Sequence, residues 1–191
     1  MKQLTFIFFI SMLLLCSCEK KKDAIVIEKK VLNSIFVDVI DSIYFKLDSA
    51  KIITRNQSKF IVVNDSVNKL GMPNSAKIFR HFKGVNQVYL DTIFENAEYK
   101  INFKTLPKSH YTFIYSSTLP HSLDRINWQN YSLPGVLTFT KMHFDIEFKV
   151  AMLGVTYGNG SVWTSKEFYI YAKKRNENWI IDQVLLRDLI Y

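Results

Sequence analysis

Cysteine, glycine and proline are all scarce in this chain of 191 residues, and each scarcity excludes a class of protein. Two cysteines are too few to build a disulfide scaffold. Six glycines and four prolines exclude a collagen-like or low-complexity chain. A hydrophobic fraction of 48% and a charged fraction of 22% exclude a disordered chain. The length suits a single domain better than two, so we expect one globular domain.

Catalytic motifs are missing as well. The chain has no Gly-x-Ser-x-Gly elbow and no His-Glu-x-x-His pair. Its Gly154, Gly158 and Gly160 do not precede a predicted helix, which argues against a nucleotide-binding loop, and we expect no cofactor. A hydrolase stays open, because glycosidase-type chemistry needs only two carboxylates several ångströms apart. The candidate acids are Glu95, Glu98, Asp124, Glu167 and Asp182.

Residues 1–18 have the features of a bacterial lipoprotein signal. Lys2 supplies a positive start, and residues 4–15 form an apolar run of twelve positions, broken only by Thr5 and Ser11. That run is short for a membrane span, which needs roughly 20 apolar residues. The Leu-Cys-Ser-Cys sequence that ends at Cys18 resembles the lipobox of bacterial lipoproteins. An ordinary secretory signal and an uncleaved anchor are the alternatives.

The lipobox resemblance implies that residues 1–17 are removed and that the thiol of Cys18 carries a lipid. Because Cys16 leaves with the signal, the exported domain has no thiol left for a disulfide or a thiolate metal site. Two or more acyl chains give durable attachment to a membrane of the cell envelope, with the outer membrane favoured over the inner. Residues 18–27 would then be the lipidated cysteine and a charged tether, and residues 28–191 a single α+β domain.

Residues 28–46 give the clearest helical pattern in the chain. Their apolar side chains recur at three- and four-residue spacing and form one wide stripe, which predicts a helix with one buried face. The stripe consists of Val31, Leu32, Ile35, Phe36, Val39, Ile40, Ile43 and Tyr44. The opposite face is acidic, which argues against a helix that lies on a membrane surface.

The pattern in the rest of the chain predicts mostly strands, because its segments are rich in aromatic and β-branched residues. We expect strands at 52–55, 60–63, 88–94, 99–103, 111–115, 136–144, 149–157, 162–173 and 179–187. A short helix is expected at 75–83 and a long irregular connection at 116–134. Turns at 158–161 and 174–178 join the last three strands into an antiparallel meander. The predicted fold is therefore α+β, with the N-terminal helix packed on a curved, mainly antiparallel sheet formed mainly by residues 85–190.

Four short motifs support a resemblance at the C-terminal end: Phe144-Asp145, Gly158-x-Gly160, 171–174 (Tyr-Ala-Lys-Lys) and 179–182 (Trp-Ile-Ile-Asp). Together they resemble the C-terminal pattern of uncharacterised Bacteroidota lipoproteins. The last hairpin also resembles those of cone-shaped folds similar to nuclear transport factor and the cystatins. The resemblance covers about a quarter of the chain. It implies a long helix wrapped by a curved antiparallel sheet, and it implies no activity.

One group of residues suggests a metal site. His143, Asp145, Glu147 and Lys149 alternate with apolar residues, so on one continuous strand they would share a face. Two alternatives compete with a metal site, namely an ordinary solvated strand face and a hairpin turn that begins at Asp145 and scatters the group. No third ligand is visible, and we expect no metal.

Other histidines, the surplus of basic residues and a pair of tyrosines give weaker signals. His81, His110 and His121 stand apart, and the serines beside the last two do not predict a triad, because triads are defined by geometry. The net charge of +8 is dispersed over termini and turns, which argues against nucleic acid and favours an envelope protein, anionic lipid or polysaccharide as partner. Tyr169 and Tyr171 form either an exposed aromatic face or ordinary cross-strand packing.

These patterns favour a membrane-anchored, non-catalytic binding or interaction module of the cell envelope. The alternatives are an envelope hydrolase with a pocket inside the cone, and an assembly accessory or toxin-neutralising protein. An interior with a pocket and converging titratable groups would favour the enzyme. A filled interior with an exposed edge strand or apolar patch would favour a protein partner.

Overall fold

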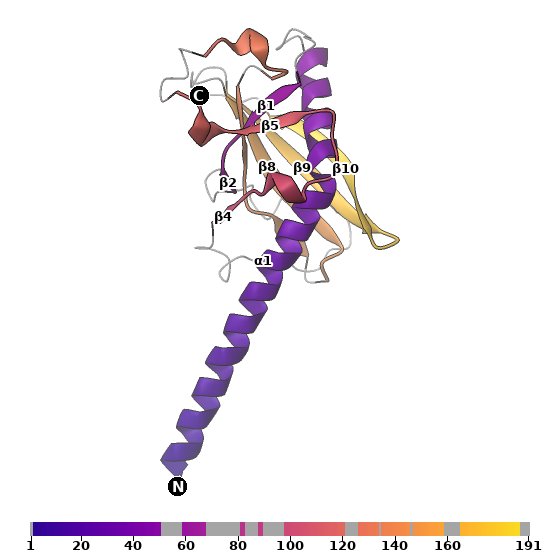
Figure 1. The fold of residues 1–191 in the computed structure, drawn as a ribbon. Helices are drawn as coiled ribbons and strands as arrows, with labels where there is room; N and C mark the ends of the chain where they lie inside the picture. Colours follow the sequence, from indigo (N-terminus) through magenta and orange to yellow (C-terminus); the bar gives the residue numbers. More distant parts are fainter. Residues whose placement is uncertain are drawn as a thin grey trace.

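The structure is a computed structural model that describes residues 2–50, 59–67, 81–82, 88–89, 98–120, 126–133, 135–145, 147–158 and 165–187, with the side chains of the helix from residue 25 onward. One long helix packs against a mixed sheet, and the chain has an α+β fold (Figure 1). The elements are α1 (Lys2–Ser49), β1 (Phe60–Val63), β2 (Ser66–Val67), β3 (Val88–Tyr89), β4 (Tyr99–Lys100), η2 (Phe103–Thr105), β5 (Thr112–Tyr115), η3 (Ser116–Thr118), η5 (Trp128–Asn130), β6 (Val136–Phe139), β7 (His143–Asp145), β8 (Val150–Gly158), β9 (Lys166–Arg175) and β10 (Asn178–Arg187).

Helix α1 confirms the predicted stripe but is longer than predicted. Its backbone is helical from Lys2 to Ser49, so the tether predicted at residues 18–27 continues the buried helix without a break. No glycine or proline interrupts this stretch. The stripe from Val31 to Ile43 is buried as expected, Tyr44 is only partly buried, and Leu47 extends the buried face by one more turn. Among the residues whose side chains are described, no helix is long and apolar enough to span a membrane.

The C-terminal meander is the best-predicted part of the sheet. Strands β8, β9 and β10 pair antiparallel in sequence order. In the turn between β9 and β10, Asn176 and Glu177 have φ angles of 48° and 66°. Two consecutive residues with positive φ are what a tight two-residue hairpin requires, and this confirms the turn predicted at 174–178.

The middle of the sheet differs from a simple meander. In the described residues the sheet has eight strands in the order β10-β9-β8-β6-β1-β5, with β7 pairing β8 and β3 off this path. Strand β1 coincides with the strand predicted at 60–63, but it lies between β5 and β6 and runs parallel to both. The sheet is therefore mixed, although mainly antiparallel, and a strand that precedes residue 85 lies in its middle.

The single strand predicted at 136–144 is wrong, because it divides into β6 and β7. Thr140 bonds to Gly154 of β8 twice, because its amide donates to the Gly154 carbonyl at 3.0 Å and its Oγ1 accepts from the Gly154 amide at 2.8 Å. The next residue, Lys141, turns into the interior. The strand predicted at 99–103 is also shorter, because β4 ends at Lys100 and η2 follows. Predictions for 52–55, 75–80, 83, 90–94 and 159–164 lie outside the described residues.

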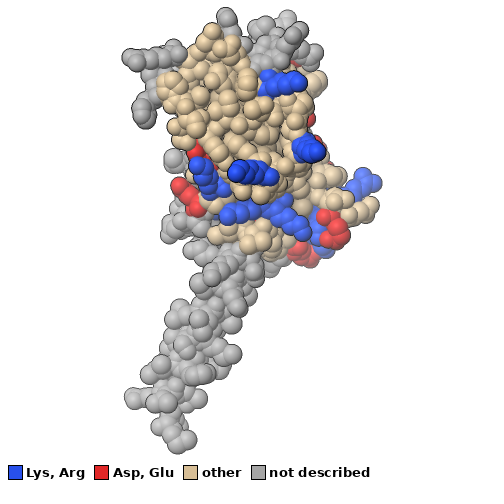
Figure 2. Space-filling view, viewed as in Figure 1, with Lys and Arg blue, Asp and Glu red and all other residues tan. Residues whose placement is uncertain are grey.

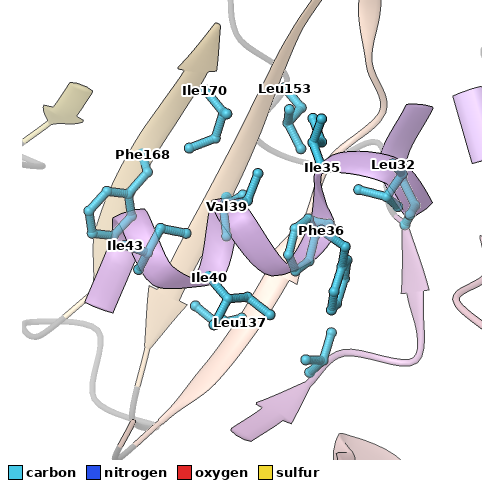
Figure 3. Close-up of a cluster of buried hydrophobic side chains, with 14 of the residues drawn as sticks. Leu32, Ile35, Phe36, Val39, Ile40, Ile43, Leu137, Leu153, Phe168 and Ile170 are labelled. Carbon is cyan, nitrogen blue, oxygen red and sulfur yellow. The ribbon is translucent and has the colours of Figure 1, made fainter. Parts of the chain in front are cut away.

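The core lies between α1 and the sheet and is filled by aliphatic and phenylalanine side chains (Figure 3). Ile43 lies near Phe168 of β9. The side chain of Val39 extends from α1 towards the strands that carry Leu153 and Ile170. Phe36 stacks on Phe139 of β6 with ring centroids 4.9 Å apart. These side chains are completely buried and belong to one continuous cluster.

A buried ion pair joins α1 to the connection between β6 and β7. Glu28 and Lys141 are only 2% and 3% exposed, and their charged atoms lie 3.4 Å apart. Glu28 Oε1 also accepts a hydrogen bond of 2.9 Å from the amide of Met142. The Lys141 ammonium lies 4.8 Å from the ring centre of Tyr99. Burial raises the pKa of Glu28, while the charge of Lys141 opposes that rise.

Removing one partner of this pair should destabilise the fold strongly. We expect Glu28→Gln to lower the free energy of unfolding by about 3–5 kcal/mol, because it leaves the Lys141 charge buried without its counter-ion. The double variant Glu28→Leu with Lys141→Met should recover most of that loss. Chemical denaturation of the purified proteins measures both effects.

The matched control is Glu147→Gln, which breaks the exposed ion pair of Glu147 with Lys149. We expect little change in its unfolding midpoint, since exposed pairs contribute little. Equal unfolding midpoints for Glu28→Gln and the wild type would contradict a structural role for the buried pair.

Candidate functional site

An open groove of about 530 Å³ lies between the C-terminal part of α1 and the edge strand β10. We call it the α1–β10 groove. Two large apolar side chains stand at its surface, Phe45 with 65% and Leu185 with 39% of its area exposed. Its lining consists of Asp41, Ser42, Phe45, Lys46, Ile181, Asp182, Gln183, Val184 and Leu185.

A β-bulge at Asp182 shapes the strand side of the groove. The register of β10 on β9 shifts between Ile181 and Gln183. Ile181 before the bulge and Val184 after it therefore both pack against the core under α1, although they are three residues apart. One extra residue reverses the alternation of a strand. The bulge thus keeps the apolar residues on the inner face and turns Asp182 outward.

The carboxylate of Asp182, on the outer face of the sheet, pairs with two basic side chains. Asp182 Oδ2 lies 2.8 Å from His81 Nε2, and Asp182 Oδ1 pairs with the ammonium of Lys173 on β9. Hydrogen bonds from Lys173 and then from His81 lower the pKa of Asp182. The His81 ring stacks on Tyr171 with centroids 4.0 Å apart. Asp182 therefore joins the segment that contains His81 to the outer face of the sheet.

The two candidate tyrosines are packed rather than exposed. Tyr169 and Tyr171 are 5% and 3% exposed and form a small cluster with Met152, against which Phe82 packs. Of the two interpretations given for these residues, cross-strand packing is confirmed and the exposed aromatic face is wrong.

The group from His143 to Lys149 does not share one strand face. His143 and Asp145 lie on β7, Glu147 lies in the turn and Lys149 stands just before β8. Asp145 Oδ1 accepts from the amide of Lys149 at 2.6 Å and from the next amide at 2.9 Å. The hairpin-turn interpretation is confirmed. Among the described residues, no three His, Cys, Asp or Glu side chains are grouped so that they could hold a metal ion.

The candidate acids that lie in the described residues, namely Glu98, Glu167 and Asp182, do not combine into a catalytic pair. Glu167 is buried and accepts from Tyr169 and from Arg187, each at 3.1 Å. Asp182 lies beside Tyr171 of β9, and Glu167 is four residues before Tyr171 on the same strand. Roughly 13 Å of strand therefore separates Glu167 from Asp182. Glu98 is exposed next to β4. Glu95 and Asp124, like His121, lie outside the described residues.

The serine next to His110 also has a local role. Ser109 Oγ accepts a hydrogen bond of 3.0 Å from the amide of Tyr111, while the ring of His110 lies on that of Tyr111. Neither side chain is placed as a nucleophile with its base.

The groove and the buried pair are not predicted from the sequence, for different reasons. Phe45 interrupts the polar face of the 28–46 pattern, and that single apolar residue was the available signal. The spacing of Trp179, Ile181, Val184 and Leu186 likewise signalled a change of alternation in β10. No local signal placed Lys141 against Glu28, because the two are 113 positions apart.

Comparisons of the chain with protein-family models, with curated proteins and with solved structures give no match.

The buried imidazole of His143 predicts acid sensitivity. Burial lowers its pKa from 6.5 to about 4, so the folded protein keeps it neutral while the unfolded chain takes up a proton. Stability should therefore fall as the pH drops from 6.5 towards 4, by roughly 3 kcal/mol from this group. Urea denaturation at several pH values measures it.

We expect His143→Gln to lose this part of the pH dependence, whereas His110→Gln, at an exposed ring, should keep it. Curves of the wild type and His143→Gln that fall in parallel between pH 6.5 and 4 would contradict the assignment.

Proposed function

We propose that this protein is a lipoprotein of the cell envelope, anchored through Cys18, whose domain is a non-catalytic binding module. The signal-like residues 1–17 and the lipobox-like sequence that ends at Cys18 support the anchor. The fold supports the binding module, because in the described residues the space between helix and sheet is filled mainly by apolar side chains, and the buried Glu28 and Lys141 pair with each other.

The observation that carries the binding role is the α1–β10 groove. Among the described residues no strand pairs with the outer edge of β10, so no strand in that part of the chain occupies its outer backbone groups. Phe45 and Leu185 offer apolar area beside this edge, and Asp41 and Lys46 add charges. Together, backbone groups and apolar surface fit an extended segment of a partner protein, which would pair with β10 and cover Phe45.

The alternatives have less support. A hydrolase would need converging titratable groups. The groove is lined by Asp41 and Asp182, and the latter is already held by His81 and Lys173. An assembly accessory or a toxin-neutralising protein would also bind a protein. These two hypotheses therefore differ from our proposal in the identity of the partner rather than in the surface used.

The anchor is tested by the two neighbouring cysteines. We expect Cys18→Ser to abolish incorporation of a clickable palmitate analogue and to release the protein from the membrane fraction of a bacterial host. Cys16→Ser should keep both, because Cys16 would leave with the signal. Equal labelling of Cys18→Ser and the wild type would contradict the proposed lipid anchor.

The groove is tested by photo-crosslinking in the cells that make the protein, with a benzoylphenylalanine at position 185. We expect one protein adduct, and a peptide of the cross-linked segment should bind the purified full chain. Phe45→Glu should weaken that binding about 10- to 100-fold, which corresponds to the burial of one large apolar side chain.

Val26→Glu is the matched control, because Val26 is also on α1 and is 64% exposed but lies outside the groove. It should bind like the wild type. If Val26→Glu and Phe45→Glu weaken binding equally, or if the adduct is a second copy of the chain, the proposed occupant is wrong.

A further inference from the structure

Basic residues gather where α1 leaves the domain. Figure 2 shows most Lys and Arg side chains of the visible face in its lower half, near that point. The exposed basic residues of this end of the domain belong to α1, to β4 and η2 beside it, and to the hairpin between β9 and β10. We call this set the basic collar, and it consists of Lys29, Lys30, Lys100, Lys104, Lys174 and Arg175.

Short contacts place the first side of the collar around one turn of α1. The ammonium of Lys29 lies 5.0 Å from the ring centre of Tyr99, whose chain neighbour is Lys100. Asn33, one turn after Lys29, donates to Thr105 Oγ1 at 3.0 Å, and Lys104 precedes that threonine. Lys29, Lys100 and Lys104 therefore stand at one level along the helix axis.

The second side of the collar is formed by the β9–β10 hairpin, which reaches the same end of the domain (Figure 1). Glu177 in its turn pairs with Lys174, and the charge of Lys30 also lowers the pKa of Glu177. Lys30 on α1 and the hairpin therefore lie near one another.

Acidic residues neutralise only part of the collar. Asp65 pairs with Lys100, and Glu177 pairs with Lys174. In the described part of the chain, no carboxylate lies within ion-pair distance of Lys29, Lys30 or Lys104. The collar therefore keeps a positive charge, and its members are exposed.

We propose that the basic collar binds the anionic surface of the bilayer that holds the lipid anchor, and that this contact tilts the domain towards the membrane. The inference rests on the proposed anchor at Cys18. Lys29 is eleven residues beyond Cys18, or about 16 Å along the helix. With α1 upright the collar would lie beyond the screening length of roughly 10 Å, whereas a tilted α1 brings it to the headgroups. Anionic lipid thus favours the tilted state.

Energy transfer from the end of α1 to the membrane measures the tilt. Ser49 is exposed and follows Cys18 by 31 residues, about 46 Å of helix, so its height responds strongly to tilt. The lipidated chain, with Ser49→Cys carrying a dye, is reconstituted into vesicles with an acceptor lipid. We expect more transfer with phosphatidylglycerol than with phosphatidylcholine alone, and loss of the difference at about 0.5 M salt.

Variants that remove positive charges test whether the basic collar causes the rise in energy transfer. Lys29→Gln, Lys100→Gln and Lys104→Gln together should abolish the rise in transfer. The matched set Lys59→Gln, Lys108→Gln and Lys166→Gln removes the same charge away from the collar and outside the groove, and it should keep the rise. Near-ultraviolet circular dichroism checks that both sets are folded.

The outcomes distinguish the collar from the anchor. If the chain floats with both kinds of vesicle but transfer is the same in each, or if the collar set keeps the rise, the collar proposal is overturned while the anchor stands. If the chain floats with neither vesicle, the anchor is wrong and the collar falls with it.

Discussion

The apolar stripe of α1 is the constraint on which the rest of the fold depends. A helix with a wide apolar face must bury it, and here the only large surface that covers it in the described residues is the inner face of the mixed sheet. Phe36 on Phe139 and Ile43 near Phe168 show that the same helix crosses strands β6 to β9. Because the stripe occupies one side only, residues off it, such as Phe45, are left at the surface and become available for contacts outside the fold.

Apolar packing alone does not fix the position of a helix along a sheet or its rotation about its own axis. Polar contacts at both ends of the buried part of α1 fix both. Glu28 meets Lys141 and the amide of Met142 near the point where α1 enters the domain. Tyr111 donates to Asp41 at 2.8 Å, between three and four turns further along. A buried charge pair adds little net stability over apolar residues of the same size, but it penalises any arrangement that separates its members. The position of the α1–β10 groove follows from these contacts and from the core, since the contacts hold the α1 wall while the pairing with β9 and the core hold the β10 wall.

Features with a local pattern were predictable from sequence, and those that depend on distant residues were not. The stripe of α1 and the strands of the C-terminal meander have a clear period, and the turn at Asn176 and Glu177 follows from its length. Parallel pairing of β1 with β5 and β6 joins residues some 50 to 75 positions apart in the chain, which no period encodes. The break at Thr140 and the pair of Lys141 with Glu28 are likewise set by partners elsewhere in the chain. The bulge at Asp182 is intermediate, because the change of alternation is visible in sequence while its contacts with His81 and Lys173 are not.

One continuous helix connects the two proposed roles. Phe45 in the groove lies 27 residues beyond Cys18, or about 40 Å along α1, so the helix separates the partner site from the anchor by more than the thickness of a bilayer core. In an upright arrangement the groove faces partners at that height above the membrane. Tilting through the basic collar would lower it, because α1 and the sheet share one core and move together. The charge of the membrane would therefore set the height at which the groove meets its partner, through the helix alone and with no rearrangement of the binding surface itself.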